Sequence, residues 1–160
     1  MIIIEKIIKN MNINLFAYGS NISAYRMLNE RKVNFISRKF AILENYKLVF
    51  NKVSKNNVYL GFANIEEYND SVVEGALYEI NDIDLKIIDR FEGAPNHYYR
   101  KIVDVICENI KEQAIVYIAN PIMIRENIKP DKNYLNYILD GKDIFSKEYF
   151  EKLKLTETID

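Results

Sequence analysis

The sequence predicts an α+β fold, built on a small mixed β-barrel or strongly curved sheet with short flanking helices. Segments with apolar residues at every second position recur along the chain, which is typical of half-buried strands. Stretches with helical spacing are short and interrupt these segments in an irregular order. The 160 residues, 49% of them hydrophobic, suffice for one core, so we expect a single domain over residues 1–160.

The strands are predicted from apolar runs and from alternation. An apolar run ends abruptly at Gly19, and Tyr46, Leu48 and Phe50 recur with a period of two. The polar stretch 66–71 is expected to form a loop between two strands. The predicted strands cover residues 13–18, 46–53, 58–65, 72–80, 99–107 and 113–119, with a looser alternation over 33–40.

One longer helix is predicted in the middle of the chain. Ile83, Ile87 and Phe91 lie four residues apart and therefore share one helix face. Asp82 is the predicted N-cap of this helix, and Gly93 suits its C′ position. Shorter helices are predicted over residues 25–30, 131–139 and 147–153.

Charge and composition exclude several classes of function. The net charge of -1 leaves no basic excess for a phosphate backbone, so we expect no nucleic acid partner. The single cysteine, Cys107, excludes an internal disulfide framework and fits a reducing compartment. No apolar run approaches the ~18 residues of a membrane span. Residues 1–10 lack the continuous apolar region of a signal peptide, and residues 1–12 could be an N-terminal extension. We expect a cytoplasmic protein with no membrane partner.

The stretch LFAYGSN at residues 15–21 is the first candidate for a binding site. It predicts a buried strand that ends in a tight loop. Gly19 lacks a Cβ, which gives the backbone conformational freedom and lets a ligand approach the chain closely. Free N–H groups in such a loop can bind an anionic oxygen. On these residues alone, an ordinary strand-to-helix turn is the commoner interpretation.

Glu92 and His97 are the candidates for acid–base chemistry. Glu92 follows Phe91 at the end of the predicted helix, where desolvation would raise the pKa of its carboxyl group and suit a general base. A solvated Glu92 is the simpler alternative, because most glutamates are exposed. His97 is the only histidine, and a lone histidine is more often a surface or packing residue than a catalyst. The sequence has neither a Cys/His cluster with metal-ligand spacing nor a glycine-rich phosphate motif.

Two stretches together resemble the gamma-glutamylcyclotransferase-like family, which includes the plant avirulence-induced proteins. The first is FAYGSN at residues 16–21. The second combines GALY at residues 75–78 with Glu92-Gly93 after a helix and Tyr99-Arg100 beyond it. The resemblance runs from about residue 13 to residue 153, nearly the whole chain.

This resemblance implies a small barrel with a pocket in which an amino acid or an amine is released from a gamma-glutamyl group, leaving 5-oxoproline. It implies a small-molecule gamma-glutamyl substrate and neither a metal nor an organic cofactor. It assigns the acid/base role to Glu92 and the tyrosine that closes the pocket to Tyr134. The implied substrate-binding loop consists of Leu15, Phe16, Ala17, Tyr18, Gly19 and Ser20.

Three points stay open at this stage. Pro95-Asn96-His97 departs from members of the family with a more polar or glycine-rich segment, so the leaving group is undefined. A non-catalytic small-molecule-binding module would keep the fold, although retention of Glu92 with the intact loop argues against it. The apolar residues 2–8 could add an edge strand and form a homodimer, which would not exclude catalysis.

Overall fold

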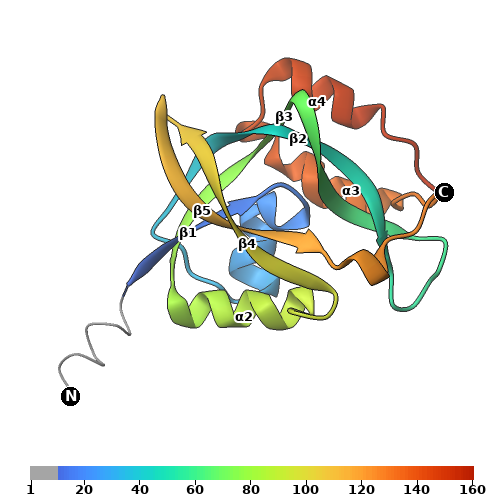
Figure 1. The fold of residues 1–160 in the computed structure, drawn as a ribbon, viewed down its shortest axis with the longest axis horizontal. Coiled ribbons are helices and arrows are strands. Elements are labelled where there is room, and N and C mark those ends of the chain that lie inside the picture. The colour runs from blue at the N-terminus through green and yellow to red at the C-terminus, as the bar shows by residue number, and fades with distance from the viewer. Residues whose placement is uncertain (1–10) are drawn as a thin grey trace.

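Five strands close into a barrel in the order β1-β3-β2-β4-β5 (Figure 1). This computed structural model describes residues 11–160. β1 pairs in parallel with β5 at Leu15 and Ile115, and the other pairings are antiparallel, so the barrel is mixed, as predicted. The strands are β1 (Asn12–Ala17), β2 (Ser37–Val53), β3 (Gly61–Asn81), β4 (Tyr98–Cys107) and β5 (Ile110–Ala119).

The predictions for the N-terminus fall largely outside the described residues. The proposed homodimer segment, residues 2–8, lies entirely outside them. The proposed extension over residues 1–12 is described only at its end, where Asn12 already belongs to β1 and pairs with Asn81 of β3. The boundary of a possible extension therefore lies before Asn12.

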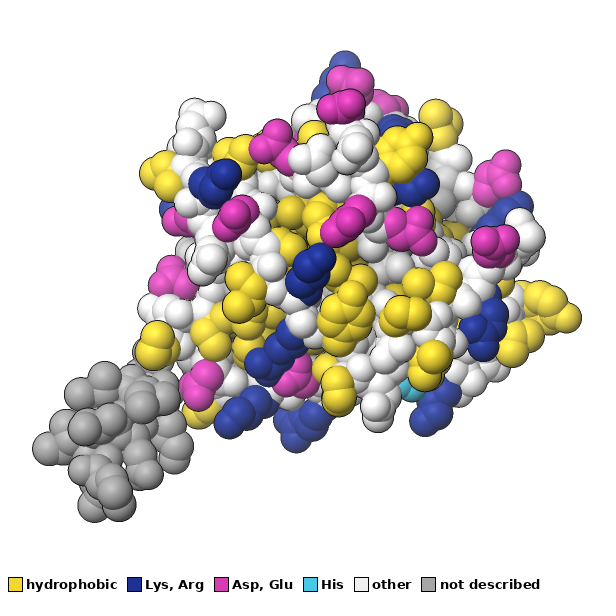
Figure 2. Space-filling model, viewed as in Figure 1, with side chains coloured by type: hydrophobic (Ala, Val, Ile, Leu, Met, Phe, Trp, Pro, Cys, Tyr) yellow, Lys and Arg dark blue, Asp and Glu magenta, His cyan; other side chains and the backbone are white. Residues whose placement is uncertain are grey.

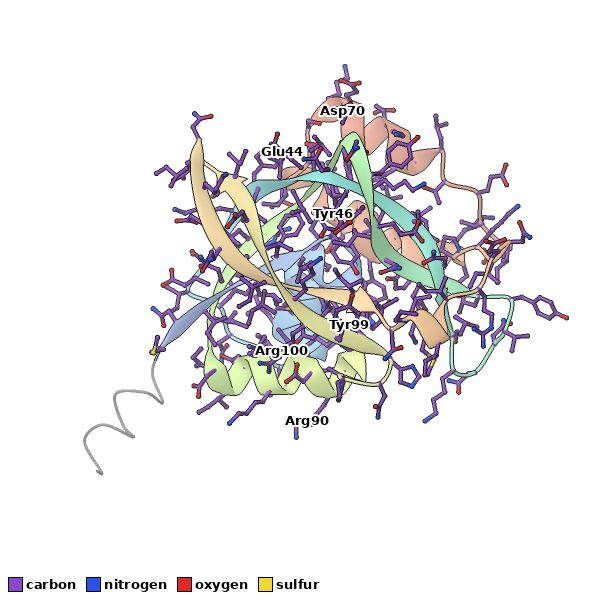
Figure 3. All side chains as sticks on the ribbon, in the orientation of Figure 1. Glu44, Tyr46, Asp70, Arg90, Tyr99 and Arg100 are labelled. Atoms are coloured by element: carbon purple, nitrogen blue, oxygen red, sulfur yellow. The ribbon has the colours of Figure 1, made fainter. Side chains whose placement is uncertain are left out.

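β2 and β3 form one long hairpin, so the predicted loop at residues 66–71 is wrong. Tyr46 lies opposite Glu67 within this hairpin, and pairing continues on both sides. The register shifts at Asn45, whose side chain accepts a hydrogen bond from the N–H of Asp70 at 3.2 Å. Figure 3 shows Glu44 and Asp70 in the upper part of the view, along the length of the hairpin and away from the turn that joins β2 to β3. Both faces are solvated there, so polar residues no longer indicate a loop.

The helix α2 (Asp82–Glu92) packs along one side of the barrel (Figure 1). Its N-cap is Asn81 rather than the predicted Asp82, because the Asn81 side chain accepts a hydrogen bond from the N–H of Asp84 at 2.8 Å. Leu85 and Ile88 are buried against the core, whereas Ile83 and Phe91, two of the three residues that define the predicted apolar face, are exposed. The helix is therefore predicted correctly, but its buried face is not. The helix ends as predicted at Gly93, which has a positive φ of 62°.

Shorter helical segments cover the other side of the barrel. α3 (Lys132–Leu139) and α4 (Lys147–Lys154) begin at side-chain caps supplied by Asp131 and Ser146. Further turns are formed by η1 (Ser20–Ile22), η2 (Arg26–Glu30), η3 (Pro121–Met123) and η4 (Asp140–Asp143). No helix within residues 11–160 is both long and apolar enough to cross a membrane.

Candidate active site

A pocket opens where β1 ends, and all eight site residues predicted from the sequence line it. The end of α2 and the start of β4 contribute to its wall, as does α3. Leu15, Phe16 and Ala17 are almost completely buried, so they join the pocket to the core. The full lining is Leu15, Phe16, Ala17, Tyr18, Gly19, Ser20, Asn21, Ala63, Glu92, Tyr98, Tyr117 and Tyr134.

Gly19 lies where there is little space for a side chain. Its φ is -107° and its ψ is -141°, a combination outside the helical and extended regions. A Cβ at this position would lie 3.2 Å from the Cβ of Ala63 and 3.4 Å from the hydroxyl of Tyr134. Among residues 11–160 the N–H of Gly19 has no hydrogen-bond acceptor. Ser20 begins the turn η1, so its N–H has no partner within that turn.

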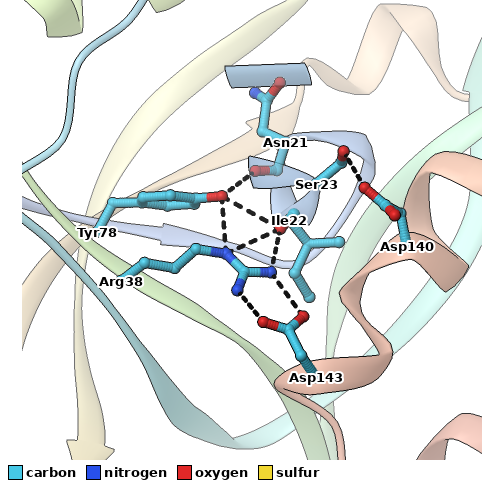
Figure 4. Close-up of polar contacts among 7 residues, drawn as sticks. All are labelled: Asn21, Ile22, Ser23, Arg38, Tyr78, Asp140 and Asp143. Atoms are coloured by element: carbon cyan, nitrogen blue, oxygen red, sulfur yellow. Dashed lines mark hydrogen bonds and ion pairs between the residues drawn. The ribbon is translucent and has the colours of Figure 1, made fainter. Parts of the chain in front are cut away.

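The loop after β1 is held from below by buried polar side chains (Figure 4). The hydroxyl of Tyr78 donates to the carbonyl of Asn21 at 2.9 Å. Arg38 donates through Nη2 to the carbonyl of Ile22 at 2.7 Å and through Nη1 to Asp143 at 2.6 Å. These bonds fix the loop backbone to β2, β3 and η4 and do not use the N–H groups of Gly19 and Ser20.

Glu92 is half-buried at the last position of α2 and faces the loop. Asn21 donates to its Oε1 at 2.7 Å, and Arg31 donates to the side-chain carbonyl of Asn21 at 3.3 Å. Burial raises the pKa of the Glu92 carboxyl group, although Arg31, Asn21, Arg26 and Lys52 oppose this shift. The fully solvated alternative does not hold, and the carboxyl group has the environment of a general acid and base.

Tyrosine side chains form most of the remaining wall, and their hydroxyls are tied to the backbone. Tyr18 donates to the carbonyl of Tyr117 at 2.6 Å, and Tyr98 donates to the carbonyl of Ala63 at 2.8 Å. The hydroxyl of Tyr134 accepts from the N–H of Ala63 at 3.0 Å. Burial raises the pKa of Tyr134 to about 12, so its hydroxyl is neutral at physiological pH. The shape of the pocket is therefore fixed before a ligand enters.

A second cavity adjoins the pocket just described. We call the first cavity the inner pocket and the second the outer basin. It shares Ser20, Glu92, Tyr98 and Tyr134 with the inner pocket, so Glu92 stands at the junction. The rest of its wall includes five basic side chains and His97, together with polar and aromatic residues. The residues of the outer basin are Ser20, Arg26, Arg31, Lys52, Ser54, Lys55, Asn56, Phe62, Arg90, Phe91, Glu92, Gly93, His97, Tyr98 and Tyr134.

The surroundings of His97 indicate that it packs against Gly93 and positions Lys52, rather than acting as a catalyst. Its Nδ1 lies 2.9 Å from the Nζ of Lys52. Burial lowers the pKa of His97, and the nearby cations Lys52 and Lys55 lower it further. The neutral ring therefore accepts a hydrogen bond from Lys52. A Cβ at Gly93 would lie 2.9 Å from the ring, so Gly93 leaves space for His97 as well as adopting a positive φ.

Several residues at the site are missing from the prediction. Asn21 stands in the quoted FAYGSN stretch, which is the only sequence signal that could have identified it. Lys52, Tyr98 and Tyr117 reach the two cavities from β2, β4 and β5, far from the motif in sequence. Their arrangement follows from the closed barrel and has no local pattern.

Solved structures of similar fold include the uncharacterised human protein loc79017, with a TM-score of 0.80 at 27% identity. That match covers 93% of this chain and 90% of the human chain. A structure named gamma-glutamyl cyclotransferase has a TM-score of 0.79 at 26% identity, covering 94% of this chain and 90% of that one. YkqA from Bacillus subtilis has a TM-score of 0.79 at 25% identity, covering 95% of this chain and 55% of YkqA.

A search of curated protein sequences gave no match. The sequence pattern of the family described as gamma-glutamyl cyclotransferase, AIG2-like, matches residues 15–141 of the chain. This range contains Glu92, Tyr134 and the whole loop after β1, and the cyclotransferase structure shares the barrel. From its sequence pattern and its fold, the chain belongs to the gamma-glutamyl cyclotransferase, AIG2-like, family.

Proposed function

We propose that the protein is a gamma-glutamylcyclotransferase, which converts the gamma-glutamyl group of a small molecule into 5-oxoproline and releases an amino acid or an amine. The family supports the general activity. One observation supports the assignment to this pocket: a half-buried Glu92 with a raised pKa is hydrogen-bonded to the glycine loop through Asn21. We assign the acid/base role to Glu92 and substrate binding to residues 15–20 and Tyr134.

In the first step, the substrate's α-amine attacks its own γ-carbonyl carbon, and a C–N bond closes the five-membered ring. The nucleophile is tethered, so the protein has to fold the substrate and move protons. The α-ammonium group must lose a proton before it can attack, and the carboxylate of Glu92 accepts that proton. The free N–H groups of Gly19 and Ser20 are donors for the oxyanion that forms on the carbonyl oxygen.

In the second step, the tetrahedral intermediate collapses and the original amide C–N bond breaks. The α-nitrogen gives up two protons in all, one before it attacks and one from the ring nitrogen of the intermediate. Glu92 accepts each proton in turn and passes it to the departing nitrogen, which leaves as an ammonium group, so the carboxylate is restored and no proton is gained or lost. A raised pKa helps Glu92 in both directions, because the group must both accept and return a proton near neutral pH. Tyr134 closes over Gly19 and limits the space available to the folded gamma-glutamyl chain.

The first experiment is an assay of 5-oxoproline formation by mass spectrometry. The substrates are gamma-glutamyl amino acids, gamma-glutamyl amines and glutathione. Glu92→Gln keeps the shape of the side chain but removes the base, so turnover is expected to fall at least ~10²-fold, the usual scale for a general base. Glu148→Gln, an exposed position on α4, is the matched control and should retain full activity.

The outcomes separate the enzyme from a binding module. Turnover that survives Glu92→Gln would contradict the assignment of this residue. A protein that forms no 5-oxoproline from any substrate, but binds a gamma-glutamyl compound in the same pocket, would instead be a non-catalytic member of the fold. Binding is measured by calorimetry with native protein and with Gly19→Ala, whose added Cβ would narrow the pocket.

A further inference from the structure

The outer basin carries much more positive than negative charge. Glu92 is the only carboxylate among its lining residues, which also include Arg26, Arg31, Lys52, Lys55 and Arg90. Arg26 has an ion pair with Glu30 at 3.5 Å. The other basic residues of the basin form no ion pair with any carboxylate in residues 11–160.

The C-terminal end of α2 forms one wall of the basin, through Arg90, Phe91 and Glu92. Lys and Arg side chains gather along the lower edge of the face in Figure 2, where α2 runs in Figure 1. Arg90 extends outward from α2 at this edge (Figure 3). A ligand approaching from this side therefore meets positive charge before it reaches Glu92.

Lys52 is the basic side chain that most clearly points to an anionic ligand. It is only 4% exposed, yet no carboxylate in the described chain lies within ion-pair distance of it. His97 accepts its hydrogen bond, and the rings of Phe62 and Tyr98 lie 5.6 and 5.5 Å from Nζ. A buried cation without an anionic partner is unfavourable, so an anion delivered by the ligand would complete the site.

The position of the basin relative to Glu92 determines which part of a substrate reaches it. This step depends on the proposed cyclotransferase function. The gamma-glutamyl half occupies the inner pocket beside Gly19, and its amide nitrogen must reach Glu92 to receive a proton. Because Glu92 lies between the two cavities, the group attached to that nitrogen extends into the outer basin.

We infer that the outer basin selects a leaving amine with two or more negative charges, and that Lys52 is a specificity-determining residue for it. An ordinary amino acid brings one carboxylate, which leaves most of the basin's cations without a partner. An acidic amino acid or a phosphorylated one brings the further charge that Lys52 and its neighbours can bind. A leaving group with an additional amine places a cation among cations and is disfavoured.

The test compares gamma-glutamyl dipeptides in which the γ-carboxyl group of glutamate is joined to the α-amine of the second residue. That second residue is glutamate, glutamine, lysine or O-phosphoserine. The glutamate and glutamine substrates have nearly the same shape and differ in one charge. We expect kcat/KM for gamma-glutamyl-glutamate to exceed that for gamma-glutamyl-glutamine by about 10- to 100-fold, the scale of a hydrogen bond to a charged group. The lysine substrate should be the slowest. The phosphoserine substrate also brings further negative charge and should likewise have a higher kcat/KM than the glutamine substrate.

Two variants assign the selectivity to the basin. Lys52→Met keeps the length of the side chain without its charge and should reduce the glutamate-to-glutamine ratio by about 10-fold. Lys86→Met, at an exposed position of α2 outside both cavities, is the control and should leave the ratio unchanged. Equal kcat/KM for the glutamate and glutamine substrates in native protein would overturn the inference and leave the proposed function intact.

A binding measurement judges the inference independently of turnover. Free glutamate and free glutamine are titrated into native protein and Lys52→Met, with the amide resonances of residues around Lys52 and His97 followed by NMR. Tighter binding of glutamate that depends on Lys52 supports the anionic basin. Equal binding of the two amino acids contradicts it. If none of the dipeptides yields 5-oxoproline, the proposed function fails, and this titration still decides whether the basin selects anions.

Discussion

Asn21 connects the glycine loop to the proposed acid–base group. Its side-chain N–H donates to Glu92, and its carbonyl oxygen accepts from Arg31. The bond to Glu92 lowers the pKa of the carboxyl group and opposes the larger effect of burial. Asn21 is therefore a positioning residue, which holds the carboxyl group toward the pocket and adjusts its affinity for a proton.

We expect Asn21→Ala to lower kcat/KM for cyclisation by about 10-fold, the scale of one hydrogen bond to a charged group. Loss of the amide donor raises the pKa of Glu92 further, so the rising limb of the pH–rate profile should move to higher pH. The measurement is kcat/KM between pH 5 and pH 9, with exposed Asn133→Ala as control. A lower rate with an unshifted profile would show a merely structural effect.

Asn21 also shows how far individual residues of the site can be predicted from the sequence. The motif identified the loop and Glu92 separately, and the resemblance assigned them to one pocket. It did not indicate that the asparagine at the end of the motif bonds to a residue 71 positions away. Such a contact depends on how α2 docks on the barrel, and no local pattern contains that information.

Among the elements, α2 matters most because its docking places Glu92. One turn before Glu92, Asp89 accepts hydrogen bonds from Arg100 of β4 at 2.8 Å and from Tyr117 of β5 at 2.6 Å. Figure 3 shows Arg100 beside α2. Burial raises the pKa of Asp89, but these donors outweigh it, and the net shift is downward. The C-terminal half of α2 is thus fixed to two strands through a single carboxylate.

Asp89→Asn should lower the free energy of unfolding by about 1–2 kcal/mol at pH 7. A lowered pKa in the folded state means that this stabilisation is present above the unfolded pKa, about 3.9, and is lost as the pH falls through the folded pKa. The difference between native protein and variant should therefore disappear in acid. Urea denaturation at several pH values measures it. The control is Asp104→Asn, at an exposed position of β4, and an equal loss there would contradict the assignment.

The prediction of elements succeeded where the residues face a core and failed where both faces are solvated. The apolar residues between 83 and 91 correctly predicted the helix α2, and Gly93 correctly predicted its end. The buried face is formed by Leu85 and Ile88, whereas Ile83, which the predicted face included, is exposed. The polar residues 66–71 predicted a loop, although they continue β3 opposite β2. Strand pairing over a long hairpin is a tertiary property, so polarity alone does not reveal it.

At the scale of the whole molecule, Glu92 favours activity at the expense of stability. Burial raises its pKa in the folded protein, so ionisation favours the unfolded state. The contribution of Glu92 to stability is fully present below the unfolded pKa of about 4.3 and is lost as the pH rises through the folded pKa. A neutral residue of the same shape should avoid this loss.

Glu92→Gln should therefore be more stable than native protein at pH 7, and the two should converge near pH 4. Each unit of pKa difference between the folded and unfolded states corresponds to about 1.4 kcal/mol. Denaturant unfolding of the native protein, Glu92→Gln and Glu148→Gln between pH 4 and pH 8 measures the effect. A variant that is less stable than native protein at pH 7 would contradict the destabilising role of the ionised carboxyl group.

The fold class of the whole molecule was predictable from the sequence, but the strand pairing that closes the barrel was not. Alternating segments and short helices correctly predicted a small mixed barrel. They did not reveal that β1 closes it by pairing in parallel with β5, about a hundred residues further along the chain. This closure brings β4 and β5 to the pocket. The basic wall of the outer basin combines Lys52 of β2 with Arg26 of η2 and Arg90 of α2, which are far apart in sequence. Sequence spacing could not predict that wall.

The tyrosines of the inner pocket also determine how the protein can be observed. The chain has 12 tyrosines and no tryptophan, so its intrinsic fluorescence comes from tyrosine alone. Tyr18, Tyr98, Tyr117 and Tyr134 surround the space that the gamma-glutamyl group is proposed to fill. A ligand that enters should change the surroundings of these rings, and with them their emission and ultraviolet absorption. We therefore expect that occupancy of the native pocket can be followed optically, without a label or an added chromophore.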